Sequence, residues 1–98
     1  MFVRIGTFAA PPAQMEELLA LFKGRVFDAF SRLEGFLGYD AFVDGASGRF
    51  VGISKWATRE ALMLSEDTGR RSRREAEALG ARWIGEPQIL EMAFERRR

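Results

Sequence analysis

Three residues in predicted strands have side chains that could accept a proton or stabilise an anion. Tyr39, the only tyrosine, and Asp40 are neighbours in one strand, and Arg4 lies in another. A tyrosine or a carboxylate can accept a proton from a bound molecule when it is suitably placed. An arginine can stabilise the anion that forms. We therefore take Tyr39, Asp40 and Arg4 as the candidate catalytic residues.

Three missing residue types exclude other chemistries. The 98 residues contain no cysteine, no histidine and no asparagine. The chain therefore lacks a thiolate nucleophile and the commonest general base and metal ligand. Ser-His-Asp and Cys-His arrangements are excluded within it. No acidic cluster has a spacing that suggests a metal site, so we expect neither a metal nor a cofactor.

The elements that must position the candidates follow from periodicity. Apolar residues recur at steps of three or four between Met15 and Leu33, which predicts one amphipathic helix. Thr58 is placed to cap a short helix, and "DGASG" is a typical hairpin turn. Strands are predicted at residues 2–9, 36–44, 50–56 and 87–94, and helices at residues 15–33, 59–66 and 68–79.

This order, β-α-β-β-α-β, predicts the α+β class with a ferredoxin-like fold, an antiparallel sheet with helices on one face. The length suits a single domain over residues 1–98. No apolar run is long enough to span a bilayer, and the N-terminus lacks the pattern of a signal peptide. We expect a cytoplasmic protein without membrane contact.

Basic residues cluster at residues 70–75 and 96–98, although the formal net charge is only +1. An anion or nucleic-acid patch is one interpretation of such runs. Balancing acids follow the first run at once, which favours a solvated helix face and a frayed tail. We therefore expect no nucleic-acid partner.

Alternation along the strands predicts two sheet faces that are both largely apolar. A single layer of helices covers only one of them, so the other would be a large exposed apolar patch in a monomer. A second copy of the same sheet would cover it. We therefore expect a homodimer that closes through a sheet face, without knowing which face.

One predicted face combines aromatic residues with the three glycines Gly6, Gly38 and Gly52. Strict alternation places Arg4 and Asp40 there too, where they could pair. Glycines between aromatic side chains could form the floor of a concave apolar pocket. They could equally relieve crowding against a helix or mark bulges. Both interpretations remain open.

Two segments carry a family resemblance. "LEGFLGYDAFVD" and "GRFVGISKWATREAL" resemble the antibiotic biosynthesis monooxygenase (ABM) domain family. Its members typically have a Pro/Glu-Gly-x-x-G-Tyr strand, an apolar strand ending in Trp, and a Glu-Ala-Leu helix. The resemblance covers most of the chain and implies a dimeric α+β barrel. Tyr39 and Trp56 match the motif.

The resemblance implies two alternative functions. Some members oxidise aromatic polyketide-like substrates with O₂ and no cofactor, and this chain would then be a cofactor-independent monooxygenase acting on an aromatic or hydrophobic metabolite. The alternative is a non-catalytic dimeric barrel that binds a small ligand or a partner. A related branch degrades haem but relies on an Asn, where this chain has Thr7, and on a His. Ser65 lies where the family often has His or Trp.

The predicted pocket combines residues of the glycine-rich face with residues of the family motif. We expect the substrate to contact Phe8, Gly38, Phe42, Gly52, Trp56 and Ser65. Core packing is the alternative role for each aromatic. Alternation assigns Tyr39 to the opposite, aliphatic face, where packing or the dimer interface is its expected role.

Overall fold

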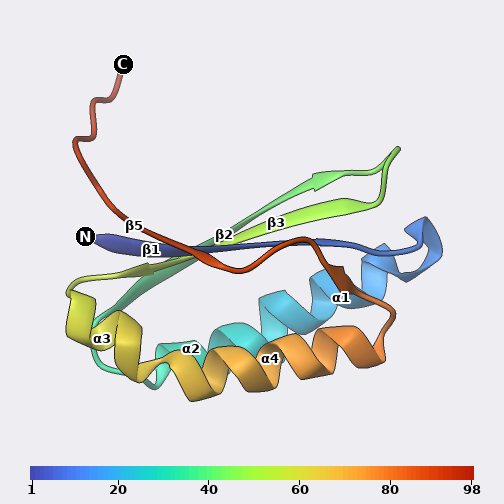
Figure 1. Cartoon of the computed structure of the whole chain (residues 1–98), viewed down its shortest axis with the longest axis horizontal. Coiled ribbons are helices and arrows are strands. Elements are labelled where there is room, and N and C mark those ends of the chain that lie inside the picture. The colour runs from blue at the N-terminus through green and yellow to red at the C-terminus, as the bar shows by residue number, and fades with distance from the viewer.

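The computed structural model describes all 98 residues as two layers, an antiparallel sheet over a layer of helices (Figure 1). The strands are β1 (Phe2–Ala9), β2 (Phe36–Asp44), β3 (Arg49–Trp56), β4 (Arg82–Trp83) and β5 (Gln88–Glu91). The helices are η1 (Pro12–Gln14), α1 (Met15–Leu21), η2 (Phe22–Val26), α2 (Phe27–Ser31), α3 (Arg59–Leu64) and α4 (Glu66–Ala78). None of them is both long and apolar enough to cross a membrane.

The sheet has the strand order β2-β3-β1-β4, and β5 also pairs with β1. All pairings are antiparallel. The predicted ferredoxin-like α+β fold is therefore confirmed. The predicted last strand is shorter, and the two-residue β4 precedes it on the same edge of β1. A strand of two residues has too little alternation to be recognised in a sequence.

The first predicted helix is one helical path made of α1, η2 and α2, with π-helical geometry in the middle. Its apolar stripe is buried as predicted, at Met15, Leu18, Phe22, Val26 and Phe30. Helix α3 begins as expected, because the Thr58 hydroxyl accepts a hydrogen bond from the Ala61 amide at 3.1 Å.

Helix α4 turns a strip of small residues toward the sheet. Gly69, Ser72 and Ala76 are its buried residues, at steps of three and four. Their small side chains leave room between the helix and the sheet, where Arg4 Nη1 lies 3.4 Å from the position of a Cβ on Gly69. Figure 1 shows α4 lying beneath the sheet alongside α2.

A β-bulge in β2 overturns part of the predicted face assignment. Phe36 pairs with Trp56 and Gly38 with Lys55, so Leu37 is an extra residue. Gly38 has a φ of 156°, which L side chains rarely adopt. Beyond the bulge every side chain changes face, because the side-chain period of a strand is two. The alternation prediction was therefore right for β1 and β3 and wrong for most of β2.

The face of the sheet opposite the helices is open and apolar. Val3, Ile5, Val51 and Ile53 lie on it half-buried, and Phe42 is 58% exposed. In Figure 1 this is the upper side of the sheet. The predicted pairing of Arg4 with Asp40 is wrong, since Asp40 lies on this open face and pairs with Lys55 at 2.8 Å.

Candidate functional site

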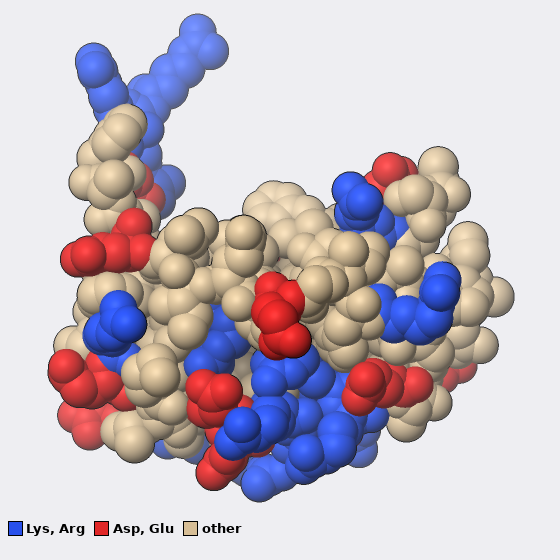
Figure 2. Space-filling model, in the orientation of Figure 1, with Lys and Arg blue, Asp and Glu red and all other residues tan.

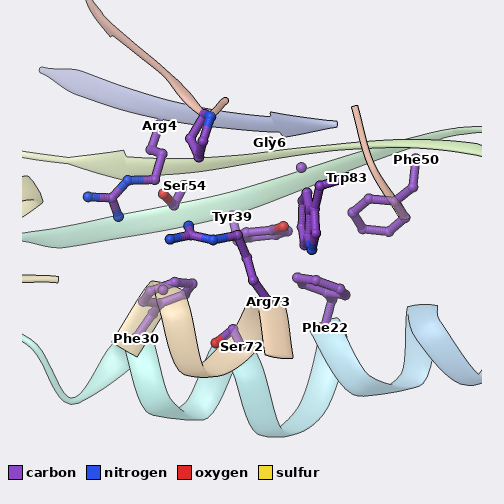
Figure 3. Close-up of a pocket in the computed structure, with 13 residues that line it drawn as sticks. Arg4, Gly6, Phe22, Phe30, Tyr39, Phe50, Ser54, Ser72, Arg73 and Trp83 are labelled. Atoms are coloured by element: carbon purple, nitrogen blue, oxygen red, sulfur yellow. The ribbon is translucent and has the colours of Figure 1, made fainter. Parts of the chain in front are cut away.

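A hollow of about 40 Å³ lies between the sheet and α4 (Figure 3). We call it the inner hollow. Its walls are mainly aromatic, and its polar groups come from β1, β2, β3, β4 and α4. Its lining residues are Arg4, Gly6, Phe22, Phe30, Tyr39, Phe50, Gly52, Ser54, Gly69, Ser72, Arg73, Trp83 and Pro87.

Two glycines that pair across β1 and β3 form the floor of the inner hollow. Gly6 is the register partner of Gly52. A Cβ at Gly6 would lie 3.2 Å from Cζ3 of Trp83, and a Cβ at Gly52 would overlap the hydroxyl of Tyr39. The glycines therefore leave room for the side chains of Trp83 and Tyr39, which lie over the surface of the sheet and come from opposite sides of the hollow.

Tyr39 separates the inner hollow from a second one. Its ring stacks on Phe22, with the ring centroids 5.7 Å apart. Beyond it lies an open side groove of about 560 Å³, lined by Leu19, Phe22, Lys23, Phe27, Tyr39, Ala41 and Val43. Burial raises the pKa of Tyr39 well above its usual value. The phenol is therefore protonated at neutral pH and can donate a hydrogen bond, but it is not a base there.

Arg4 is buried, and residues at the junction of α3 and α4 bind its guanidinium group. Its Nη1 donates to the Ser65 hydroxyl at 2.8 Å, and its Nη2 donates to the Leu62 carbonyl at 3.0 Å. The same Nη2 lies 3.8 Å from a carboxylate oxygen of Glu66. Burial lowers the pKa of Arg4, while the nearby Glu66 raises it. Ser65 thus positions the arginine.

The remaining polar groups of the inner hollow are mainly donors. The Ser54 hydroxyl accepts a hydrogen bond from Trp56 Nε1 at 3.0 Å, which leaves its own proton free. Trp83 Nε1 is buried without a hydrogen-bond partner. Arg73 extends from α4 toward the sheet in Figure 3 and forms no ion pair.

The structure brings three predicted site residues together at the inner hollow, namely Arg4, Tyr39 and Gly52. Tyr39 faces the helices because of the bulge, so its assignment to the aliphatic face was wrong. Phe8 and Trp56 lie behind the walls. Phe8 stacks on Phe50 at 4.4 Å, and both Phe8 and Trp56 are fully buried.

Gly38, Asp40 and Phe42 lie away from the inner hollow, on the open face. Their placement on the glycine-rich face was wrong, because the bulge at Leu37 reverses the alternation. Ser65 is buried beneath Arg4 and does not line the hollow.

Sequence reasoning missed the contribution of α4 and of the segment before β5. Arg73 was assigned to a solvated basic run, and Trp83 to no element. One signal was available, since Gly69, Ser72 and Ala76 recur at helical spacing and mark a buried face of the helix. Nothing in the local sequence indicates that Trp83 reaches Gly6.

The fold and the hollow define a class of small α+β proteins with an aromatic-walled site between the sheet and its helices. Within that class the chain belongs to the antibiotic biosynthesis monooxygenase family, whose sequence profile matches residues 1–70. The family resemblance in the two motif segments is thereby confirmed. A search of curated proteins found no match.

Similar solved structures cover nearly the whole chain. A variant of SnoaB, a cofactor-independent oxygenase from Streptomyces nogalater, is 17% identical over 96% of this chain and 94% of that one, with a TM-score of 0.72. Rv0793 from Mycobacterium tuberculosis is 19% identical over 98% of both chains, with a TM-score of 0.73.

A third similar structure contains a ligand. The monooxygenase from the gene ActVA-Orf6 of Streptomyces coelicolor, in complex with nanaomycin D, is 24% identical over 99% of this chain and 89% of that one. Its TM-score is 0.67. At these identities the similarities establish the fold.

Proposed function

We propose that the protein binds an aromatic or hydrophobic small molecule in the inner hollow and oxidises it with O₂, without a cofactor. The observation that carries this proposal is the convergence of aromatic walls and two arginines over a floor of paired glycines. Flat aromatic ligands pack well against such walls. The nanaomycin D bound in the ActVA-Orf6 structure and the cofactor-independent oxygenase activity of SnoaB support the same class of ligand and reaction.

An anthrone illustrates the balance of such a reaction. Its ring CH₂ group loses both hydrogens and gains one oxygen atom from O₂, while the second oxygen atom leaves in water. The substrate supplies all four electrons. The step begins when the substrate loses a proton, and an arginine such as Arg4 would stabilise the resulting anion. Tyr39 would donate a hydrogen bond to the substrate and not take its proton.

A non-catalytic ligand-binding barrel is the second candidate. It is favoured by one observation: no carboxylate side chain lines the inner hollow, so a general base is missing there. Asp40, the predicted alternative base, is paired with Lys55 on the open face. In this case the same aromatic walls would bind a ligand without converting it.

Oxygen consumption with a panel of anthrones and quinols separates the two candidates. Ser72→Leu should block the inner hollow, while Ser31→Leu makes the same change at the exposed end of α2. The oxygenase predicts O₂ uptake with matching ketone formation, lost in the first variant and kept in the second. Tight binding without turnover across the panel would reject oxidation and leave the binding barrel.

We also propose that two copies assemble through the open face of the sheet. Helices cover the other face, so only this one is free to meet a second copy. Its exposed apolar residues include Phe42, and Leu90 of β5 continues the patch beside Val3. A face of this kind is the expected interface of a two-fold dimer.

A further inference from the structure

Two arginines from different layers converge on one buried point. Their Nη1 atoms lie 3.4 Å (Arg4) and 3.6 Å (Arg73) from the position that a Cβ on Gly69 would occupy. Arg4 comes from β1 and Arg73 from α4, and both line the inner hollow. The charge of Arg73 also lowers the pKa of Arg4, in addition to burial. Like charges held this close in a poorly solvated place repel each other.

The protein compensates these two positive charges only in part. Glu66 is the only carboxylate near Arg4, at 3.8 Å, and it is shared with Arg70 at 3.6 Å. Arg73 has no carboxylate partner, although acids are plentiful along α4. An anion bound between the two guanidinium groups would relieve the repulsion and use their free N–H donors.

The route to this point from solvent has more basic than acidic side chains. An outer hollow of about 330 Å³ shares Arg73, Trp83 and Pro87 with the inner hollow. Arg70 and Arg74 line it as well, together with Glu77 and Glu86. Figure 2 shows a cluster of basic side chains low in the view, with acidic side chains at its edge, over the region where Figure 1 places α4. The inner hollow has room for only a few water molecules as it stands, so side chains of its lining must move when an aromatic molecule enters.

We propose that Arg4 and Arg73 form an anion subsite, and that the protein selects aromatic molecules that carry a carboxylate. This rests on the proposed function, because it assigns the polar end of the ligand that the aromatic walls would hold. A carboxylate presents two oxygens to the planar forks of the guanidinium groups. Trp83 Nε1, buried without a partner, is a further donor for an acceptor atom of such a ligand.

Binding of naphthoate and naphthamide to the intact protein at pH 7 tests the subsite. The two probes have the same flat shape, but only naphthoate is charged. Calorimetry should show naphthoate binding about tenfold more tightly than naphthamide, a typical gain from a charge-assisted contact. The advantage should shrink when salt is raised if it is electrostatic.

Arg73→Gln is the decisive variant. It should remove the preference for naphthoate over naphthamide, because the charge contact to the carboxylate is lost. Arg71→Gln is the matched control, since Arg71 is exposed on the same helix and lines neither hollow. It makes the same charge change and should keep the preference.

The outcomes distinguish a failure of the anion subsite from a failure of the proposed aromatic site. If both probes bind equally well, the aromatic site stands and the anion subsite is overturned. The subsite is also overturned if Arg71→Gln abolishes the preference as fully as Arg73→Gln, because the effect is then general charge. If neither probe binds to the folded protein, the aromatic site of the proposed function fails and the subsite fails with it.

Discussion

The hydroxyl group of Tyr39 occupies the space in which a side chain at position 52 would begin. Tyr39 belongs to β2 and Gly52 to the neighbouring β3, where Gly52 pairs with Ala41. The tyrosine reaches this place because the bulge at Leu37 turns it toward the helices. The need for glycine at position 52 of β3 therefore depends on the bulge in β2.

Gly52→Ala should destabilise the protein. The added methyl group would also lie 2.9 Å from Tyr39 Cζ and 3.1 Å from Phe50 Cε1. Overpacking of this kind costs about 1–3 kcal/mol of unfolding free energy. Gly24→Ala is the control, because nothing lies within 4 Å of its added carbon and a helical alanine gains up to about 1 kcal/mol. Urea denaturation measures both, and equal stabilities would contradict the overlap.

Tyr39 should ionise only at strongly alkaline pH in the folded protein. Burial raises its pKa, and an unfolded tyrosine titrates near pH 10. Because it is the only tyrosine, absorbance at tyrosinate wavelengths reports it directly. Its contribution to stability is complete below about pH 10 and is lost as the pH rises toward the folded pKa. Tyr39→Phe should flatten this alkaline loss in thermal melts. A folded-state titration near pH 10 would show that the phenol is accessible to solvent.

Arg4 and Ser65 should be energetically coupled. Arg4→Met removes the charged donor of the Ser65 hydroxyl and of the Leu62 carbonyl, while Ser65 still donates to that carbonyl, so we expect a cost of about 1–2 kcal/mol. Ser65→Ala should cost less in the Arg4→Met background than in the wild type. A double-mutant cycle by denaturant unfolding measures the difference, expected at about 1 kcal/mol. Additive effects would contradict a shared hydrogen-bond network.

Ile53→Glu should dissociate the proposed homodimer. Ile53 lies in the middle strands of the open face, where a second copy would bury the new charge. Leu64→Glu is the control, because Leu64 is 81% exposed on α3, away from that face. Sedimentation at micromolar concentration should find the first variant monomeric and the second dimeric. A wild-type protein that sediments as a stable monomer would overturn the assembly.

The fold could be predicted because its signals are local and repetitive. The stripe from Met15 to Phe30, the Thr58 cap and the turn after Asp44 each specify an element from neighbouring residues. The order of these elements then allows only a few topologies for the sheet. The site was only partly predictable, because an extra residue at Leu37 changes the face of everything that follows it in β2.

Sequence alone determined the class of fold, the absence of histidine, cysteine and asparagine, and the family. Those properties depend on composition, periodicity and motifs, which can be recognised in short stretches of the sequence. Only the tertiary structure decided that Tyr39 faces the hollow, that Asp40 does not, and that Arg73 meets Arg4 across Gly69. The physical reason is that these relationships join residues from separate elements, and their positions depend on strand register, the bulge and how closely α4 approaches the sheet.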